Sequence, residues 1–241
     1  MAQMQFDRRQ AILTLLQEKK SATVRELAAT IYTSEASVRR DLEALEAEGY
    51  LHRVYGGAVL AQPANAVTPL VLRDGEHAAQ KEEIAKRAAE LVSDGSTLMM
   101  DASSTTRRML KYLEHRHRLR IFTNNLRVPE LMANTDAEIY LSGGLYDRKN
   151  HAFVGPAAER FLASVSADLL FFSSQGLSEN GEISDVSAID NSLRRVMLSR
   201  AQTKIFLCDS SKLGLRRDFL LCTRHDVDMI LCDQPLPWEA Q

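Results

Sequence analysis

The chain of 241 residues has few cysteines and no long apolar run, and each absence narrows what it can be. Its three cysteines, Cys208, Cys222 and Cys232, are odd in number and lack the spacing of a zinc site, so we expect buried, reduced thiols. No stretch approaches the roughly 18 apolar residues of a membrane helix, and charged residues at 7–9 interrupt any signal-like segment. These features predict a cytoplasmic protein without membrane association.

A strong charge of one sign is also lacking, as are the common cofactor motifs. The formal net charge is −2, which argues against a protein that coats nucleic acid broadly. No GxGxxG sequence predicts a dinucleotide site, and His115 and His117 stand in a charged segment without a third metal ligand. We therefore expect no metal and no cofactor. The composition, 45% hydrophobic and 26% charged, is typical of a globular protein of one or two domains.

The most informative segment, residues 34–58, is patterned for DNA recognition. Val38, Leu42 and Leu45 recur at helical spacing and form one apolar stripe. The opposite side is small and cationic in its first half and acidic in its second half, which phosphate would repel. Only the first turns can therefore enter a DNA groove, as in a recognition helix. The candidate DNA contacts in these turns are Ser34, Ala36, Ser37, Arg39 and Arg40.

Two helices before this segment and a hairpin after it complete a recognisable module. Apolar residues at helical spacing predict both helices, and Thr23 with Glu26 matches a capping box at the start of the second. Alternation around the glycine pair 56–57 predicts a small hairpin, or wing, whose Arg53 could reach the DNA backbone or minor groove. Together these elements predict a winged helix-turn-helix domain over residues 1–60.

The charge of this domain leaves a second interpretation open. Residues 1–60 hold equal numbers of basic and acidic side chains, so the criterion of a basic nucleic-acid-binding domain is not met. An inert helical bundle with a solvated charged face would show the same periodicity.

The order of the residues, however, resembles a known family. The segments REL at 25–27, SEASVRRDLEALEAEG at 34–49 and RVYGGA at 53–58 are similar to the amino-terminal signature of DeoR-family bacterial transcriptional regulators. Ser37 and Tyr55 depart from that signature, standing where Thr and His are commoner, and either change could alter the operator that is read. The resemblance implies that the domain binds double-stranded DNA.

Residues 61–75 and 76–241 differ from this domain in their pattern. The first range carries two prolines and no helical period, which predicts a linker. In the second range, the predicted effector-sensing and oligomerisation domain, helix-like and strand-like segments alternate. Strands are expected at 96–100, 120–123, 138–141, 169–172, 204–207 and 229–232. This alternation predicts an α/β fold with a mostly parallel sheet covered on both faces.

Small or polar residues follow several of these strands, at the edge where open α/β sheets bind ligands. One such segment, 101–106, runs from a strand into a helix, where backbone amides and the positive helix end suit an anion. Each segment alone is also typical of a cap or a turn, so the prediction rests on their joint occurrence. The predicted anion site consists of Asp101, Ser103, Ser104, Thr105, Thr106, Thr123, Asn124, Asn125, Gly143, Gly144 and Lys212.

The DeoR-family resemblance continues through this region and spans almost the whole chain. A Lys-led helix, a D…ST loop and the TN, GG, VG and D.SK patterns are matched at Lys81, Asp101, Ser104, Thr105, Thr123, Asn124, Gly143, Gly144, Val154, Gly155, Asp209, Ser211 and Lys212. The resemblance implies a sensor domain, similar to ribose 5-phosphate isomerase, for phosphorylated sugars or related metabolites. Arg194 stands where Lys is commoner in the family and is expected to contact the effector.

The implied similarity to an isomerase makes an enzyme the alternative function. Aldose–ketose isomerisation needs a carboxylate base, but Ser173, Ser174 and Gln175 stand where an acidic pair is expected. The remaining candidate bases are Asp168, Glu182, Asp185 and Asp190, but a single acid near a loop is more often a cap or a solvated charge, so no catalytic residue is predicted. We expect a transcriptional regulator, with repression as the favoured polarity, that binds repeated half-sites as a homo-oligomer, dimer or tetramer. An orphan regulator with a vestigial pocket is the second alternative.

Overall fold

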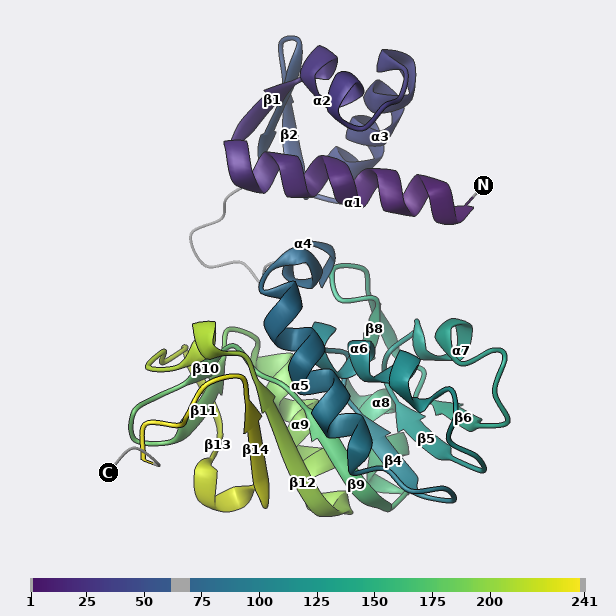
Figure 1. Cartoon of the computed structure of the whole chain (residues 1–241), viewed down its shortest axis with the longest axis vertical. Coiled ribbons are helices and arrows are strands. Elements are labelled where there is room, and N and C mark those ends of the chain that lie inside the picture. Colours follow the sequence, from purple (N-terminus) through teal and green to yellow (C-terminus); the bar gives the residue numbers. More distant parts are fainter. Residues whose placement is uncertain (1, 62–69, 239–241) are drawn as a thin grey trace. The chain divides into compact units, whose positions relative to one another are not determined.

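The computed structural model describes residues 2–61 and 70–238, and the chain divides into two compact units, Met1–Glu76 and His77–Gln241 (Figure 1). Each unit has its own buried apolar core. Within the described ranges, no helix combines the length and the apolar character that crossing a membrane requires. Of the predicted linker, residues 62–69 lie outside the described ranges, and residues 70–75 form a short helix that the sequence pattern did not predict.

The first unit has the helices and the hairpin of a winged helix. Its helices are α1 (Ala2–Lys19), α2 (Val24–Thr30), α3 (Glu35–Ala47) and α4 (Leu70–Gly75). Its strands are β1 (Ser21–Thr23), β2 (Leu51–Val54) and β3 (Gly57–Leu60). β3 pairs antiparallel with both neighbours, so β2 and β3 form the predicted wing and β1 adds a third strand. The winged-helix prediction is confirmed, whereas β1 is too short to show an alternating pattern.

Local sequence signals determine where these helices begin and which side of α3 is buried. Thr23 begins α2 with a capping box, in which the Glu26 carboxylate accepts a hydrogen bond of 2.8 Å from the Thr23 amide. Ser34 caps α3 by accepting from the Ser37 amide at 3.2 Å. The predicted apolar stripe of α3 is buried and belongs to the core that this helix shares with α1 and α2.

The two glycines of the wing have different roles. Gly56 turns the chain with a φ of 77°, a left-handed conformation that favours glycine. Gly57 lies against β1, where a Cβ atom would stand 2.3 Å from the carbonyl oxygen of Ala22. A side chain at position 57 would therefore force β1 and β3 apart, which explains why the wing needs the second glycine.

A buried carboxylate joins α1 to α3. The Asp41 side chain has no exposed surface and pairs with two arginines of α1. Arg8 donates to it over 2.5 Å and Arg9 over 3.3 Å, and Arg9 also reaches Glu48 at 3.2 Å. A charge out of water is tolerated when it is paired and hydrogen-bonded. Asp41 therefore anchors α1, and it is not one of the solvated acids of α3.

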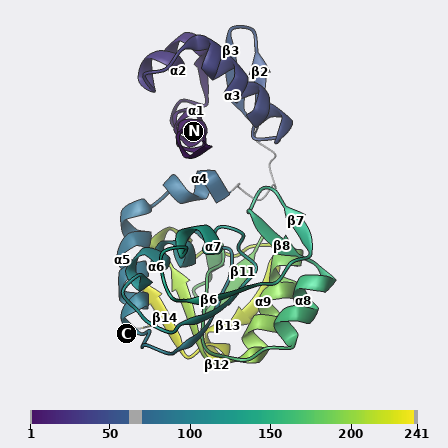
Figure 2. The ribbon, with the colours of Figure 1, turned by 90° about the vertical axis from the view of Figure 1, so that its right-hand side faces the viewer.

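The second unit is built on a parallel sheet of six strands in the order β14-β12-β9-β4-β5-β6. The strands are β4 (Thr97–Met100), β5 (Arg120–Thr123), β6 (Glu138–Leu141), β9 (Ala167–Phe172), β12 (Ala201–Cys208) and β14 (Met229–Cys232). The helices are α5 (Ala78–Glu90), α6 (Ser104–Leu113), α7 (Val128–Leu131), α8 (Pro156–Ala163) and α9 (Ala188–Arg200). Figure 2 shows α5 and α6 on one side of the sheet and α8 and α9 on the other, and each side has its own apolar cluster. The predicted α/β fold is confirmed.

Shorter elements lie outside the central sheet. They are the hairpin β7 (Leu145–Asp147) and β8 (Ala152–Val154), the antiparallel strands β10 (Gly176–Leu177), β11 (Glu182–Asp185) and β13 (Phe219–Thr223), and the 3-10 turns η1 (Ser210–Lys212) and η2 (Arg224–Asp226). The sequence pattern predicted none of these strands, because each is short and lies outside the central sheet.

Candidate functional site

The first turns of α3 hold the predicted DNA contacts on an exposed face. The exposed or half-exposed side chains there are Ser34, Ala36, Ser37, Arg39 and Arg40. Arg39 forms an ion pair of 2.8 Å with Glu35, one turn earlier in the helix. The contacts of Arg40 with the Ala36 carbonyl and the Ser37 hydroxyl are longer, 3.4 Å each. Of the two guanidinium groups, that of Arg40 is therefore the more readily available to a partner.

The wing is held against the second half of α3. Glu46 accepts hydrogen bonds from the Arg53 backbone amide at 2.8 Å and from the Arg53 guanidinium at 2.7 Å. The backbone bond from Arg53 lowers the pKa of Glu46, and the hydrogen bond to Glu46 raises the pKa of Arg53. Arg53 was predicted as a DNA contact, and in the structure it first of all fixes the wing relative to α3.

Two exposed tyrosines belong to the same module. Tyr32 lies in the turn before α3 and is 96% exposed, and Tyr55 is fully exposed at the tip of the wing. Tyr32 was not predicted as a contact, and Tyr55 was noted only as a departure from the family signature. Single exposed aromatic side chains are common on protein surfaces, so exposure alone does not assign either tyrosine to a contact surface.

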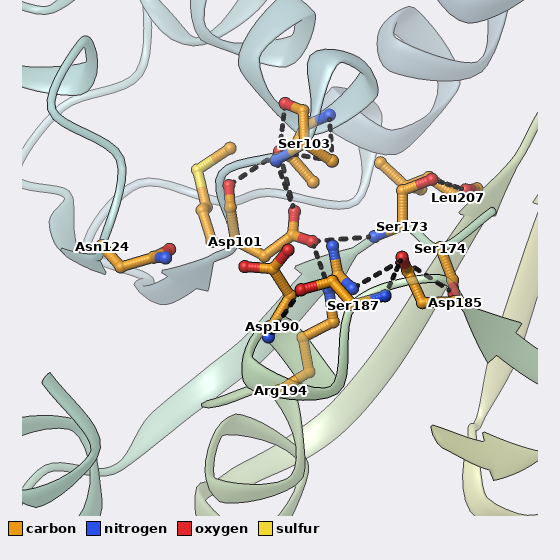
Figure 3. Close-up of polar contacts among 12 residues, drawn as sticks. Asp101, Ser103, Asn124, Ser173, Ser174, Asp185, Ser187, Asp190, Arg194 and Leu207 are labelled. Carbon is orange, nitrogen blue, oxygen red and sulfur yellow. Dashed lines mark hydrogen bonds and ion pairs between the residues drawn. The ribbon is translucent and has the colours of Figure 1, made fainter. Parts of the chain in front are cut away.

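In the second unit, Asp101 connects the ends of two strands (Figure 3). It follows β4, and its carboxylate accepts hydrogen bonds from the Ser103 amide at 3.1 Å and the Thr106 hydroxyl at 3.0 Å. It also accepts from the Ser173 amide, after β9, at 3.3 Å. Ser103 in turn caps α6 by accepting from the Thr106 amide at 3.2 Å. The loop that was predicted to cradle an anion is thus closed around a carboxylate of its own.

Arg194 of α9 connects this loop to a second buried carboxylate. Its Nε donates to Asp101 at 2.9 Å and its Nη1 donates to Asp185 at 2.8 Å. The three side chains are 9%, 3% and 3% exposed. Burial alone would lower the pKa of Arg194, but the charges of Asp185 and Asp101 outweigh burial and raise the pKa. Arg194 lies at the predicted site, where it bridges two anions of the protein itself.

Lys212, at the end of η1, is paired as well. Its ammonium stands 3.0 Å from the Asp209 carboxylate and donates to the Ser173 hydroxyl at 2.8 Å. Burial acts to raise the pKa of Asp209, but the charges of Lys212 and Lys81 contribute to a net lowering. The Lys212 side chain keeps 16% of its surface exposed, which leaves room for a further contact.

Three buried polar atoms near the ends of β4 and β5 have no hydrogen-bond partner among the described residues. They are the hydroxyl oxygen of Thr105, the side-chain oxygen Oδ1 of Asn124 and the side-chain nitrogen Nδ2 of Asn125. Such an atom costs about 1–3 kcal/mol, and native proteins supply a water or a ligand for most of them. Figure 3 shows the Asn124 side chain directed toward the space beside Asp101 and Asp190. The unpaired atoms mark a place that water or a ligand can occupy, which sequence patterns do not show.

Two other predicted contacts take part in the fold. The Thr123 hydroxyl donates to the Met100 carbonyl at 2.7 Å, which ties the ends of β4 and β5 together. It also accepts from the backbone amide of Asn125 at 3.0 Å. Ser104 is buried in the first turn of α6.

The glycine pair between β6 and β7 combines a packing role with an open position. Gly144 has a φ of 118°, and a Cβ atom there would stand 2.9 Å from the Val154 carbonyl oxygen of β8. The close approach to β8 therefore requires glycine. At Gly143 a Cβ atom would meet open space, which is compatible with the close ligand approach that was predicted.

Of the positions where an acidic pair was expected, 173 and 174 hold serines and 175 holds glutamine. Ser173 and Ser174 donate to the carbonyls of Leu207 and Ser184, each at 2.6 Å. Among the nearby carboxylates, Asp101 and Asp185 pair with Arg194, and Asp209 pairs with Lys212. In the described part of the chain, no group of three or more His, Cys, Asp and Glu side chains is placed to hold a metal ion.

Comparison with known proteins covers both units. The profile of the DeoR-like helix-turn-helix domain matches residues 8–64, and that of the DeoR C terminal sensor domain matches residues 76–234. The chain is 30% identical to the HTH-type transcriptional regulator GolR of Listeria innocua, with 96% of this chain and 91% of that protein covered. It is also 30% identical to the L-fucose operon activator of Escherichia coli K12, over 96% of each chain. Among solved structures, ribose 5-phosphate isomerase A of Methanocaldococcus jannaschii superposes on 55% of this chain and 53% of its own, at 16% identity and a TM-score of 0.41.

Proposed function

Because the chain belongs to the DeoR family of transcriptional regulators, we propose that it binds operator DNA through α3 and the wing, under the control of a phosphorylated sugar or a similar anionic metabolite. The observation that supports DNA binding best is the exposed cationic start of α3. In its second half Glu46 holds the wing and Glu43 is exposed, so this half is acidic and would repel phosphate. Phosphate would therefore meet the first turns of the helix.

Replacing Arg40 with alanine should weaken operator binding and lower its salt dependence. An arginine that reads a base contributes about 1–3 kcal/mol of discrimination, so we expect a loss of affinity of roughly tenfold or more. Where the side chain instead contacts phosphate, the slope of log affinity against log salt should fall by about 0.9. Fluorescence anisotropy measures both effects, with an operator fragment selected from genomic DNA by the wild-type protein.

The matched control is Lys19→Ala, which removes the same charge from the exposed end of α1. It should leave affinity nearly unchanged. Equal losses in the two variants, or no loss in Arg40→Ala, would contradict the assignment of α3 as the recognition helix.

The proposed ligand combines an anionic group with hydroxyl groups. The exposed part of the Lys212 ammonium can approach an anionic group, whereas the amino end of α6 already faces the Asp101 carboxylate. The unpaired side-chain atoms of Asn124 and Asn125 offer an acceptor and a donor, and the Thr105 hydroxyl can act as either, as sugar hydroxyls require. Because these atoms are buried, we expect loops at this edge of the sheet to open when the ligand enters.

Thr105→Val tests the ligand contact separately from the fold. Valine keeps the shape of threonine, and the hydroxyl that it removes has no partner among the described residues, so the free protein should be as stable as wild type or slightly more stable. Ligand at 100 times its Kd stabilises a protein by about 2.7 kcal/mol, of which a tenfold weaker Kd removes about 1.4 kcal/mol. The thermal shift with pentose and hexose phosphates should therefore shrink by about half.

Thr106→Val is the contrasting control, because that hydroxyl donates to Asp101. This variant should lose about 1–3 kcal/mol in the free protein. An undiminished ligand shift in Thr105→Val would place the ligand elsewhere. A wild-type protein that no sugar phosphate stabilises would favour the alternative of a vestigial pocket.

The proposal also covers whether the protein represses or activates transcription, its oligomeric state and whether it has enzymatic activity. We propose repression, binding to repeated half-sites as a dimer or tetramer in the cytoplasm, and no enzymatic turnover. In a relative named as an operon activator the polarity is the opposite, so a transcription assay with and without ligand decides it. Turnover of pentose or hexose phosphates by the purified protein would restore the isomerase alternative.

A further inference from the structure

Two of the three cysteines lie side by side at the carboxyl edge of the sheet. Cys208 ends β12 and Cys232 ends β14, and the two are register partners in adjacent parallel strands. Both are free and buried, and both side chains belong to the same apolar cluster, so they lie on the same face of the sheet. The expectation of buried cysteines therefore holds for these two, whereas Cys222 is half-buried, and the pairing is one that the sequence pattern did not indicate.

The pairing satisfies the first requirement of a disulfide. Adjacent strands are about 4.8 Å apart, within the range of roughly 4.4–6.8 Å that Cα atoms of bonded cysteines adopt. Interaction with the neighbouring Cys232 thiol, together with burial, raises the pKa of Cys208, whereas interaction with Cys208 lowers the pKa of Cys232. Cys232 also keeps 7% of its surface exposed, and Cys208 none. The more acidic and more accessible thiol is therefore Cys232.

We propose that Cys208 and Cys232 form an oxidisable dithiol, a modification site that closes to a disulfide when a hydroperoxide reaches it. The Cys232 thiolate attacks the terminal peroxide oxygen, the O–O bond breaks, and the alkoxide leaves with a proton as the alcohol. The Cys208 thiol then attacks the sulfenic sulfur, which forms the S–S bond and releases water. Two thiols are oxidised, and one hydroperoxide is reduced to alcohol and water.

Closure would be transmitted to the segment that carries Lys212. The Cys208 thiol donates to the Asp209 carbonyl at 3.6 Å, and the Cys232 thiol donates to the Asp233 carboxylate at 3.8 Å. Asp233 in turn accepts from the amide and the hydroxyl of Ser210, at 2.6 and 2.8 Å, and so fixes the start of η1. A disulfide removes both thiol donors. We expect faster amide exchange over residues 209–213 in the oxidised protein.

Peptide mapping of the full-length wild-type protein tests the proposal. Native protein is treated with hydrogen peroxide, alkylated under denaturing conditions and digested without reductant. The expected product is a Cys208–Cys232 linked peptide that dithiothreitol separates, accompanied by faster exchange over 209–213. Cys222 lies on β13, and burial raises its pKa to about 12, so it should remain alkylatable and serve as the internal control.

Two variants sharpen the outcome. Cys222→Ser should still form the linked peptide, and Cys232→Ser should not. If Cys232→Ser does not fold, the wild-type map alone decides. Full alkylation of Cys208 and Cys232 after peroxide, overoxidation of Cys232 without linkage, or linkage that involves Cys222 would overturn the proposal.

Discussion

Replacing Arg194 with methionine should destabilise the second unit by about 3–5 kcal/mol, the cost of breaking a buried ion pair from one side. The guanidinium bonds Asp101 and Asp185, each 3% exposed, so its loss leaves two carboxylates in the interior without a counter-charge. Methionine fills much of the same volume, so the effect reports charge more than a cavity. Denaturant unfolding can be followed by fluorescence of Trp238, the single tryptophan of the chain.

Two controls separate the ion pair from a general effect of changing α9. Arg194→Lys keeps the charge but can bond only one carboxylate well, so its loss should lie between wild type and Arg194→Met. Arg195→Met changes the neighbouring exposed arginine, whose partner is the Leu220 carbonyl, and should cost about 1 kcal/mol or less. Equal losses in Arg194→Met and Arg195→Met would show that the buried pairing contributes little.

The role of Arg194 illustrates what the sequence does not contain. Arg194 was expected to contact the effector only because it stands, within a predicted helix, where the family commonly has Lys. One of its partners, Asp101, lies 93 residues away and is brought to it only by the order of strands in the sheet. The same limit applies to Lys212, because its second partner, Ser173, follows a different strand.

Patterns that are local, by contrast, were sufficient to predict most of the fold. The stripe of α3 and the capping box of α2 each depend on spacings within one helix, and all six strands of the parallel sheet are apolar runs bounded by turns. The antiparallel strands β10, β11 and β13 escaped prediction because two to five residues cannot establish a period. Asp41 is an intermediate case. It lies three residues after Val38 and four before Leu45, on the buried stripe, so its position alone indicates an unusual carboxylate.

Asp41→Ala should destabilise the first unit by about 2–4 kcal/mol and abolish operator binding at temperatures where the unit then unfolds. This loss of stability is smaller than for most broken buried pairs, because the side chains of Arg8 and Arg9 are 26% and 25% exposed and can turn toward water. Alanine has a higher helix propensity than aspartate, by up to about 0.7 kcal/mol, so propensity alone would make the variant more stable. Amide exchange of peptides from α1 and α3 measures the loss in this unit, while Trp238 reports the other.

Glu48→Gln provides the matched control, since Glu48 is the outer partner of Arg9 and is 35% exposed. An exposed pair contributes about 1 kcal/mol at most, so this variant should remain close to wild type. A double-mutant cycle isolates the inner pair: Arg8→Ala should cost clearly less in the Asp41→Ala background than in the wild-type protein. Equal costs in both backgrounds would mean that Asp41 acts through α3 alone, and the orientation of the recognition helix would then not depend on its anchor to α1.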